Sequence, residues 1–309
     1  MTRIVGIGTY IPGDRRDNRP LCATFDITPD FLREKIGVLE RARKADDEET
    51  SDMCVAAFRD LAERTGIGAI DVDAVIVVTQ NPDGRGLPHT AAAVHAKIGA
   101  NPRCATFDVS QGCAGFIYGL SIAQGLLAGG SARRVLLMTC DPYSKIVDPA
   151  DRNTALLFGD GASATLLDDD SGPGWIAENF RFGMLSGERG ALEAKPDGFF
   201  MDGRGVFNFA AIHVSKEIGS VLADAGLSLD QIDMFALHQG SKYIVDTIVR
   251  RMGLPREKVP FEIEHVGNTV SSSIPLLVAD RLKDTNINTM LLCGFGVGLS
   301  LATCILHRT

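Results

Sequence analysis

The sequence lacks the main features of secreted, zinc-binding and nucleic-acid-binding proteins. Its seven cysteines are scattered singly over 309 residues, with no CxxC pair and no Cys/His cluster at zinc spacing. A disulfide framework or a metal site is therefore not expected. Lys and Arg total 31 against 39 Asp and Glu, and this net charge of −8 argues against a nucleic-acid surface as the main function. The N-terminus lacks the apolar core of a signal peptide, so the sequence predicts a cytoplasmic protein with free thiols.

One uncharged stretch, residues 285–306, is long enough to cross a bilayer. Its middle is interrupted by Gly294, Gly296 and Gly298. Glycines in this arrangement favour two strands joined by a tight turn over a single transmembrane helix. The sequence therefore predicts no membrane span.

The composition and the apolar pattern predict an α/β fold. Apolar residues make up 45% of the chain and charged residues 23%, a balance typical of a globular protein with a large core. Short, nearly continuous apolar runs, typical of strands buried on both faces, lie at 75–78, 135–138, 234–237 and 290–293. Helical patterns lie between them, at about 50–64, 115–128, 211–225, 241–252 and 274–282. Strands that alternate with helices indicate a layered α/β protein.

The two halves of the chain resemble each other. The strands predicted at 75–78 and 234–237 each follow a helix, a glycine-containing turn and a short acidic segment. This echo predicts a duplicated α/β unit with its junction near residues 168–176, where 168–174 is a loop, and thus two halves spanning 1–170 and 171–309. Chance similarity between α/β segments is the alternative.

Cys113 is the candidate nucleophile. It lies among small residues in Gln111-Gly112-Cys113-Ala114-Gly115, where a strand passes into a helix. Small neighbours let a substrate carbonyl approach the sulfur, and a helix N-terminus is expected to lower the pKa of the thiol. A buried structural cysteine is the alternative interpretation.

Three further segments carry candidate polar groups. His238 ends a predicted buried strand, where α/β folds place ligands and catalytic groups, although a core histidine is equally compatible with the pattern. Asn268, in a Gly-Asn turn before a Ser-rich helix start, offers an uncharged amide donor or only a cap. The glycines of 294–298 would let backbone N–H groups approach a reacting centre, or would only form a hairpin.

Taken together and in order, these segments resemble the β-ketoacyl-acyl-carrier-protein synthase III family. The resemblance extends over essentially the whole chain, and it is carried by 4–12, 111–116, 151–152, 158–162, 238–239, 267–269 and 294–296. It implies a thiolase-like α/β fold, with two duplicated βαβαβαββ halves in a layered α-β-α-β-α arrangement.

The resemblance also implies a reaction in fatty-acid biosynthesis. Cys113 would take an acyl group from acyl-CoA, and a malonyl thioester on acyl carrier protein would then lose CO₂ and attack that acyl group. His238 and Asn268 would donate hydrogen bonds to the thioester oxygen. The backbone N–H groups of Cys113 and Val297 would hold the oxyanion. No cofactor is implied beyond the substrates themselves.

The resemblance further implies binding residues and partners. Residues implied for acyl-CoA are Phe31, Lys35, Arg152 and Arg204, with Leu87 at the end of an acyl tunnel across a homodimer interface. Residues implied for docking of acyl carrier protein are Lys242, Arg250 and Arg251. Lys145 lies in a segment that lines the family's site, where it would meet an anionic acyl group.

Two alternatives remain beside this condensing acyltransferase. An enzyme of the same fold could pass the Cys113-bound acyl group to an alcohol, an amine or another small acceptor without condensation. The chain could also be an inactive partner subunit. Departures from the family pattern at 111–112 and 239–241 favour a specialised pathway over general fatty-acid initiation.

Overall fold

The computed structural model describes residues 2–170, 172–195 and 198–309. Its main sheet has nine strands in the order β11-β12-β13-β8-β1-β7-β6-β4-β5. The first half supplies β1 (Arg3–Tyr10), β4 (Ala74–Val78), β5 (Ala105–Val109), β6 (Arg134–Cys140) and β7 (Ala162–Asp168). The second half supplies β8 (Trp175–Met184), β11 (Met234–Leu237), β12 (Thr289–Gly296) and β13 (Ser300–Arg308). A single residue pair, Ile4 with Trp175, joins the halves through β1 and β8, so the sheet divides there into two blades.

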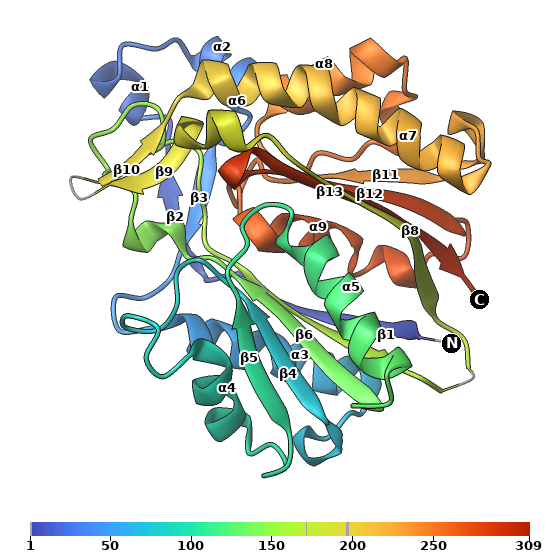
Figure 1. Ribbon diagram of the computed structural model, residues 1–309. Helices are drawn as coiled ribbons and strands as arrows, with labels where there is room; N and C mark the ends of the chain where they lie inside the picture. The colour runs from blue at the N-terminus through green and yellow to red at the C-terminus, as the bar shows by residue number, and fades with distance from the viewer. Residues whose placement is uncertain (1, 171, 196–197) are drawn as a thin grey trace.

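Helices cover both faces of each blade, which gives five layers (Figure 1). The helices α5 (Gly115–Ala128) and α9 (Ser273–Val278) lie between the blades. On the outer faces lie α3 (Thr50–Thr65) and α4 (Thr90–Ile98) for the first blade, and α7 (Ser215–Ala225) and α8 (Lys242–Met252) for the second. Ile76 and Val78 of β4 pack between the blades, whereas Val75 and Val77 pack against α3 and α4. The apolar strand runs are therefore buried on both faces, as their composition predicts.

The blades repeat one strand order, and this confirms the predicted duplicated, thiolase-like α/β fold. The order β1-β7-β6-β4 of the first half matches β8-β13-β12-β11 of the second. The second half lacks a described counterpart of β5: residues 259–263 form no strand, and Pro260 has no N–H for a ladder. The boundary predicted between residues 170 and 171 involves residue 171, which lies outside the described residues. The boundary therefore stays a prediction.

Most predicted elements are present, with shifted ends. The uncharged stretch 285–306 forms β12, a tight turn and β13, as expected. No helix in the described part of the chain is long and apolar enough to cross a membrane. The helix predicted at 211–225 begins with a π-helical segment, Ala210–Val214. This segment joins α6 (Gly203–Phe209) directly to α7. The smaller elements are two short helices, α1 (Leu21–Thr24) and α2 (Pro29–Phe31), and two antiparallel strand pairs. These pairs are β2 (Asp14–Asp17) with β3 (Glu40–Arg43) and β9 (Leu192–Lys195) with β10 (Gly198–Met201).

Candidate active site

A cavity of about 380 Å³ brings the four predicted catalytic residues together. Cys113 comes from the segment before α5, and His238 from the end of β11. Asn268 lies in the loop before α9, and Val297 in the turn between β12 and β13. The two halves of the chain therefore both supply groups to one pocket, as α/β folds commonly do at strand ends.

Two backbone N–H groups contact the buried Cys113 thiol, which is only 5% exposed. Those of Val297 and of Cys113 itself interact with the sulfur. Gly296 has a φ of +153°, and a Cβ at this position would lie 2.5 Å from Sγ of Cys113. Only glycine therefore lets the backbone come close enough for the Val297 N–H to face the reacting atoms.

The predicted direction of the Cys113 pKa is wrong. Burial raises the pKa of the thiol to about 12, and the hydrogen bond from the Val297 backbone lowers it by less than burial raises it. Removal of the thiolate from water outweighs the expected benefit of the helix N-terminus. The resting enzyme therefore holds a thiol, whose proton must leave during the attack.

His238 is a neutral, tightly packed imidazole. Burial lowers its pKa to about 3, so the ring carries no charge near neutral pH. Its Nδ1 lies 2.7 Å from Oγ of Ser273, and Phe295 meets the ring edge-on at 5.4 Å between centroids. A neutral imidazole of this kind can donate one hydrogen bond, but it is a poor base.

The side chain of Asn268 is oriented by its own loop. Its Oδ1 accepts a hydrogen bond of 2.9 Å from the N–H of Val270, whose φ of +54° is strained for a β-branched residue. The amide Nδ2 is left for the pocket that Asn268 lines. The loop is held by close packing at Gly159, where a Cβ would overlap the carbonyl oxygen of Val266. The strained backbone and the close packing together hold the Asn268 amide as an uncharged donor at the pocket.

A buried carboxylate connects this loop to the first half. Asp141, at the end of β6, accepts hydrogen bonds from the Gln80 N–H (2.6 Å) and the Ser271 hydroxyl (2.5 Å). Burial raises the pKa of this carboxyl from 3.8 to about 6. Its charge near neutral pH is thus held in place by donors from two loops, at a cost in stability.

Replacing Asp141 with asparagine is expected to remove a pH dependence of folding stability. Because the folded pKa is raised, the wild-type contribution is fully present below the ordinary value of 3.8 and is lost as pH rises through about 6. Two pKa units correspond to roughly 3 kcal/mol. In urea unfolding, the free energy of unfolding of the variant should rise relative to that of wild type, by an amount of this size, between about pH 4 and pH 7. A free-energy difference that is constant with pH would contradict the prediction.

The pocket mouth contains an aromatic and cationic layer. Phe31, Lys35 and Arg152 line it, as expected. The Nζ of Lys35 lies 3.9 Å above the Tyr243 ring, and Phe207 stacks on the same ring with 5.0 Å between centroids. Tyr243 and Phe207 were not predicted, because no local signal in the sequence links α6 to the start of α8.

Two predicted binding residues lie outside this pocket. Arg204 is not among the described residues that line it; its neighbours Gly203 and Val206 are, because α6 turns the Arg204 side chain elsewhere. Leu87 is 94% exposed in the loop after β4 and does not line the pocket of its own chain. A role for Leu87 in a partner's tunnel stays a prediction.

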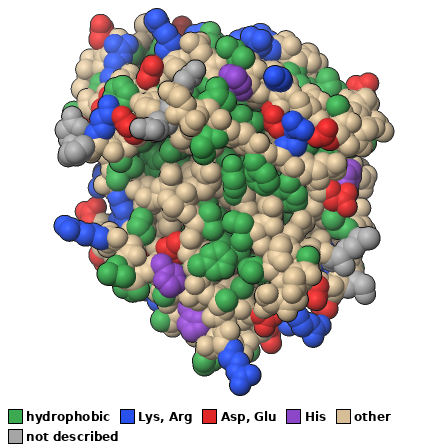
Figure 2. Space-filling model, viewed as in Figure 1, with side chains coloured by type: hydrophobic (Ala, Val, Ile, Leu, Met, Phe, Trp, Pro, Cys, Tyr) green, Lys and Arg blue, Asp and Glu red, His purple; other side chains and the backbone are tan. Residues whose placement is uncertain are grey.

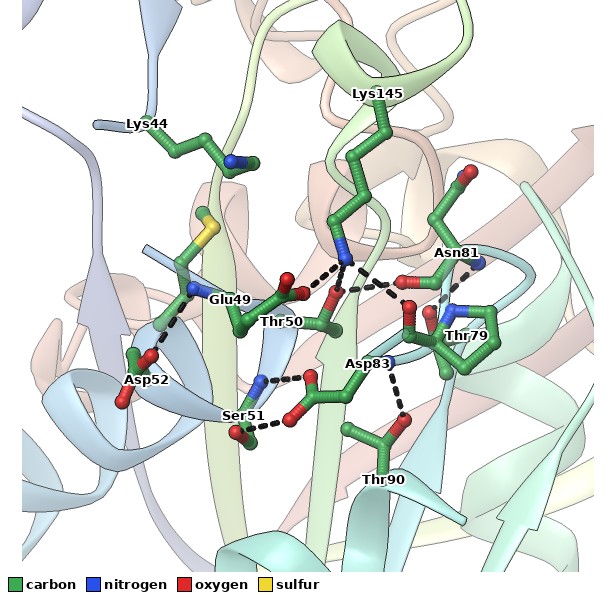
Figure 3. Close-up of polar contacts among 12 residues, drawn as sticks. Lys44, Glu49, Thr50, Ser51, Asp52, Thr79, Asn81, Asp83, Thr90 and Lys145 are labelled. Atoms are coloured by element: carbon green, nitrogen blue, oxygen red, sulfur yellow. Dashed lines mark hydrogen bonds and ion pairs between the residues drawn. The ribbon is translucent and has the colours of Figure 1, made fainter. Parts of the chain in front are cut away.

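Lys145 does not face the pocket, so the predicted contact with an anionic acyl group is wrong. Its Nζ donates to Glu49 Oε2 at 2.6 Å, to Thr50 Oγ1 at 3.1 Å and to the Pro82 carbonyl at 3.0 Å (Figure 3). The lysine holds down the Glu49 pKa through this bond. Its charge therefore serves to tie α3 to the loops that follow β4 and β6.

Aromatic side chains form a wall behind Cys113. Tyr143 stacks on Phe158 with 4.6 Å between ring centroids, and Phe199 meets both rings edge-on at 5.2 and 5.7 Å. These rings belong to one apolar cluster with Cys113 and Leu192. This wall is not predictable from local sequence, because its members come from three distant segments.

The predicted docking residues on α8 differ in their surroundings. Lys242 pairs with Glu34 at 2.9 Å and with Asp246 at 3.0 Å, and these carboxylates raise its pKa. Its charge is therefore already compensated within the chain. Arg250 and Arg251 are exposed in the last turn of α8.

Comparison with known proteins matches this geometry to one family. The model for 3-oxoacyl-[acyl-carrier-protein] synthase III matches residues 107–183, and the model for its C-terminal part matches residues 222–308. The β-ketoacyl-[acyl-carrier-protein] synthase III of Streptococcus mutans is 35% identical over 96% of both chains. The chain belongs to the 3-oxoacyl-[acyl-carrier-protein] synthase III family.

Solved structures of 3-oxoacyl-[acyl-carrier-protein] synthase III proteins share the fold. The enzyme from Thermus thermophilus superposes with a TM-score of 0.89 at 34% identity, over 99% of this chain and 98% of that one. A priming β-ketosynthase of a polyketide biosynthetic pathway gives a TM-score of 0.90 at 30% identity, over 99% and 96%. In this synthase III chain, Cys113 falls in the first matched part, and His238 and Asn268 fall in the second. No cluster of His, Cys, Asp or Glu suited to a metal occurs among the described residues.

Proposed function

We propose that this chain transfers an acyl group from acyl-CoA to Cys113 and condenses it with a malonyl group carried by acyl carrier protein, giving a 3-oxoacyl product. One observation carries the proposal. Two uncharged donors, His238 and Asn268, share one pocket with a buried thiol and with a backbone N–H aimed at its sulfur. Neutral donors aimed at a developing oxyanion stabilise charge that exists only in the transition state.

The first stage is thioester exchange. Sγ of Cys113 forms a bond to the acyl carbon, the bond from that carbon to the CoA sulfur breaks, and the thiol proton passes to the departing sulfur. The N–H groups of Cys113 and Val297 hold the carbonyl oxygen while it carries negative charge. No oxidant, reductant or metal is needed for this step.

The second stage is decarboxylative condensation. The electron pair of the malonyl C–CO₂ bond moves into an enolate, whose oxygen accepts hydrogen bonds from His238 and Asn268. The enolate carbon then attacks the acyl carbon on Cys113, and the sulfur leaves as a thiolate that takes up one proton. The side chains supply positioning and hydrogen bonds, so we propose no cofactor beyond the substrates.

The surroundings of His238 argue against simple acyl transfer. An alcohol or amine acceptor needs a general base to remove its proton, and a base works best with a pKa near the operating pH. Burial places the pKa of His238 at about 3. An inactive subunit is also disfavoured, because Cys113, His238 and Asn268 all face one cavity.

The proposal is tested with a panel of acyl-CoAs of differing length and branching, followed by malonyl-acyl carrier protein. Intact-protein mass reports acylation, and CO₂ release and product mass report condensation. Equal amounts of CO₂ and 3-oxoacyl product are expected. Acyl transfer to another acceptor without CO₂ would establish the alternative, and no acylation by any donor would refute both.

Replacing Asn268 with alanine is expected to separate the two stages. Loss of one oxyanion donor should slow CO₂ release about 100-fold, whereas acylation of Cys113 should persist. Stopped-flow measurement of CO₂ and intact-protein mass provide the two readouts. Parallel loss of both would contradict the assignment, because it would indicate a collapsed loop.

The mouth residue Tyr243 is expected to contribute to CoA binding. The Tyr243→Ala variant should bind CoA about 10-fold more weakly by calorimetry, since aromatic and cation–π contacts each contribute on the order of 1 kcal/mol. Phe200→Ala is the matched control, because Lys195 lies 4.2 Å above the Phe200 ring and that ring does not line the pocket. Equal weakening in both variants would contradict the prediction.

We further propose that acyl carrier protein docks near Arg250 and Arg251.

We also propose that the chain forms a homodimer. Exposed apolar side chains support the dimer: Leu87, Phe182 and Met184 are 94%, 45% and 60% exposed. Figure 2 shows apolar side chains gathered in the middle of the face where α5 lies. Sedimentation velocity tests the dimer. The cytoplasmic location stays a prediction.

A further inference from the structure

The Ser273 hydroxyl forms a hydrogen bond with Nδ1 of His238. Oγ of Ser273, the first residue of α9, lies 2.7 Å from Nδ1, and both side chains are buried. No other side-chain hydrogen bond to either group is present in residues 2–170, 172–195 and 198–309. The contact joins the end of β11 to the start of α9, and so it depends on the packing of the second half.

The direction of this hydrogen bond determines where the imidazole carries its proton. A neutral imidazole has one N–H, on either Nδ1 or Nε2. If Nδ1 carried it, the Ser273 oxygen would accept, and its own hydrogen would have no protein acceptor among the described groups. The adjacent Ser272 hydroxyl, by contrast, has the carbonyls of Thr139 and Gly161 at 3.0 and 3.1 Å. Because an unsatisfied buried donor is costly, the Ser273 O–H is expected to donate to Nδ1.

Packing, rather than Ser273, sets the orientation of the ring. Phe295 stands perpendicular to the imidazole with 5.4 Å between the ring centroids, and His238 is only 2% exposed. Removal of the Ser273 hydroxyl should therefore leave the ring in place. What it should change is the choice between the two tautomers.

We propose that Ser273 is a positioning residue that holds His238 in the tautomer with hydrogen on Nε2, ready to donate to the thioester oxygen as CO₂ departs. The catalytic consequence rests on the proposed function. The tautomer itself does not, and it can be measured without any substrate. Hydrogen-bond partners of one ring nitrogen commonly determine the protonation of the other.

A second, smaller cavity lies beside Ser273. It has a volume of about 100 Å³ and is lined by Ser273, Gln239 and Thr269 among others. Oγ1 of Thr269 has no hydrogen-bond partner among the described residues. A water molecule here would offer the Ser273 hydroxyl a second acceptor and weaken its preference for Nδ1.

The first experiment is nitrogen NMR of protein labelled at histidine. The His238 signal is assigned by its loss in His238→Gln. We expect Nε2–H in the wild type, a mixture of tautomers in Ser273→Ala, and recovery of Nε2–H in Ser273→Thr, which keeps the hydroxyl. An Nδ1–H signal in the wild type, or an unchanged tautomer in Ser273→Ala, would overturn the proposal.

The second experiment separates positioning from general damage. Ser273→Ala should slow CO₂ release about 10- to 100-fold, less than loss of a whole donor, while acylation of Cys113 is retained. Ser272→Ala is the matched control, since this serine is equally buried but does not touch His238. It should lose thermal stability yet keep the Nε2–H tautomer. Equal loss of CO₂ release in both variants, without a tautomer change, would assign Ser273 a merely structural role. A wild type that neither acylates nor releases CO₂ would refute the proposed function and leave the NMR result standing.

Discussion

Replacing Cys113 with alanine is expected to abolish acylation, with a loss of at least about 1000-fold in the overall condensation rate. The reason is that the sulfur lies in the pocket beside the Val297 backbone N–H and is the atom that forms the covalent intermediate in the proposed reaction. Intact-protein mass after exposure to acyl-CoA should show one added acyl group in the wild type and none in the variant. Slow release of CO₂ from the malonyl thioester should survive, because His238 and Asn268 remain.

A second thiol provides the control for this experiment. Cys104 is partly exposed, whereas Cys113 is buried, so chemical accessibility alone would favour labelling of Cys104. Cys104→Ala should still take up one acyl group per chain. If acylation followed Cys104 instead, the modification would be a non-enzymatic reaction of an accessible thiol.

Replacing Gly296 with alanine is expected to inactivate the enzyme although no reacting group is removed. A Cβ would lie 2.5 Å from Sγ of Cys113, so either the thiol or the turn that carries the Val297 N–H must shift. Loss of one oxyanion donor together with a displaced nucleophile should slow acylation by at least about 1000-fold. Single-turnover acylation, followed by mass, measures the effect.

Gly298→Ala is the matched control for this glycine. Gly298 also has a positive φ, of +76°, but a Cβ there would meet nothing within 4 Å. The control therefore suffers backbone strain of about 1 kcal/mol without crowding the sulfur. Comparable loss of acylation in both variants would show that strain in the turn, rather than contact with Cys113, accounts for the effect.

The strand and helix pattern was largely predictable, because it depends on local apolar periodicity. The helix predicted at 115–128 is α5 itself, and the strand predicted at 234–237 is β11. The missing counterpart of β5 was not predictable. Residues 259–263 lie between two helices, where a strand would be expected. The chain just beyond them pairs instead with the first half, because the backbone N–H groups of Leu39 and Ala42 donate to the carbonyls of Glu264 and Val266. That pairing partner is more than 200 positions away in the sequence.

The residues of the site were predictable in type and less so in environment. Cys113, His238 and Asn268 lie in short motifs whose order along the chain is specific, and they meet in one cavity. Arg204 and Lys145 were assigned by position along the chain, yet α6 and the Glu49 ion pair direct their charges away from the pocket. A charged side chain follows its nearest partner, and only the folded chain determines which partner that is.

The sequence by itself determined where the main strands and helices lie along the chain, the nucleophile and the two donors, because apolar runs and ordered motifs are local properties. Only the tertiary structure decided their protonation. Burial, which depends on contacts between distant segments, raises the pKa of Cys113 to about 12 and lowers that of His238 to about 3. The contacts of Ser273 with His238 and of Lys35 with Tyr243 likewise join segments that are far apart in the chain. Desolvation and hydrogen bonding act through space, and so the chemistry of this pocket is a property of the fold.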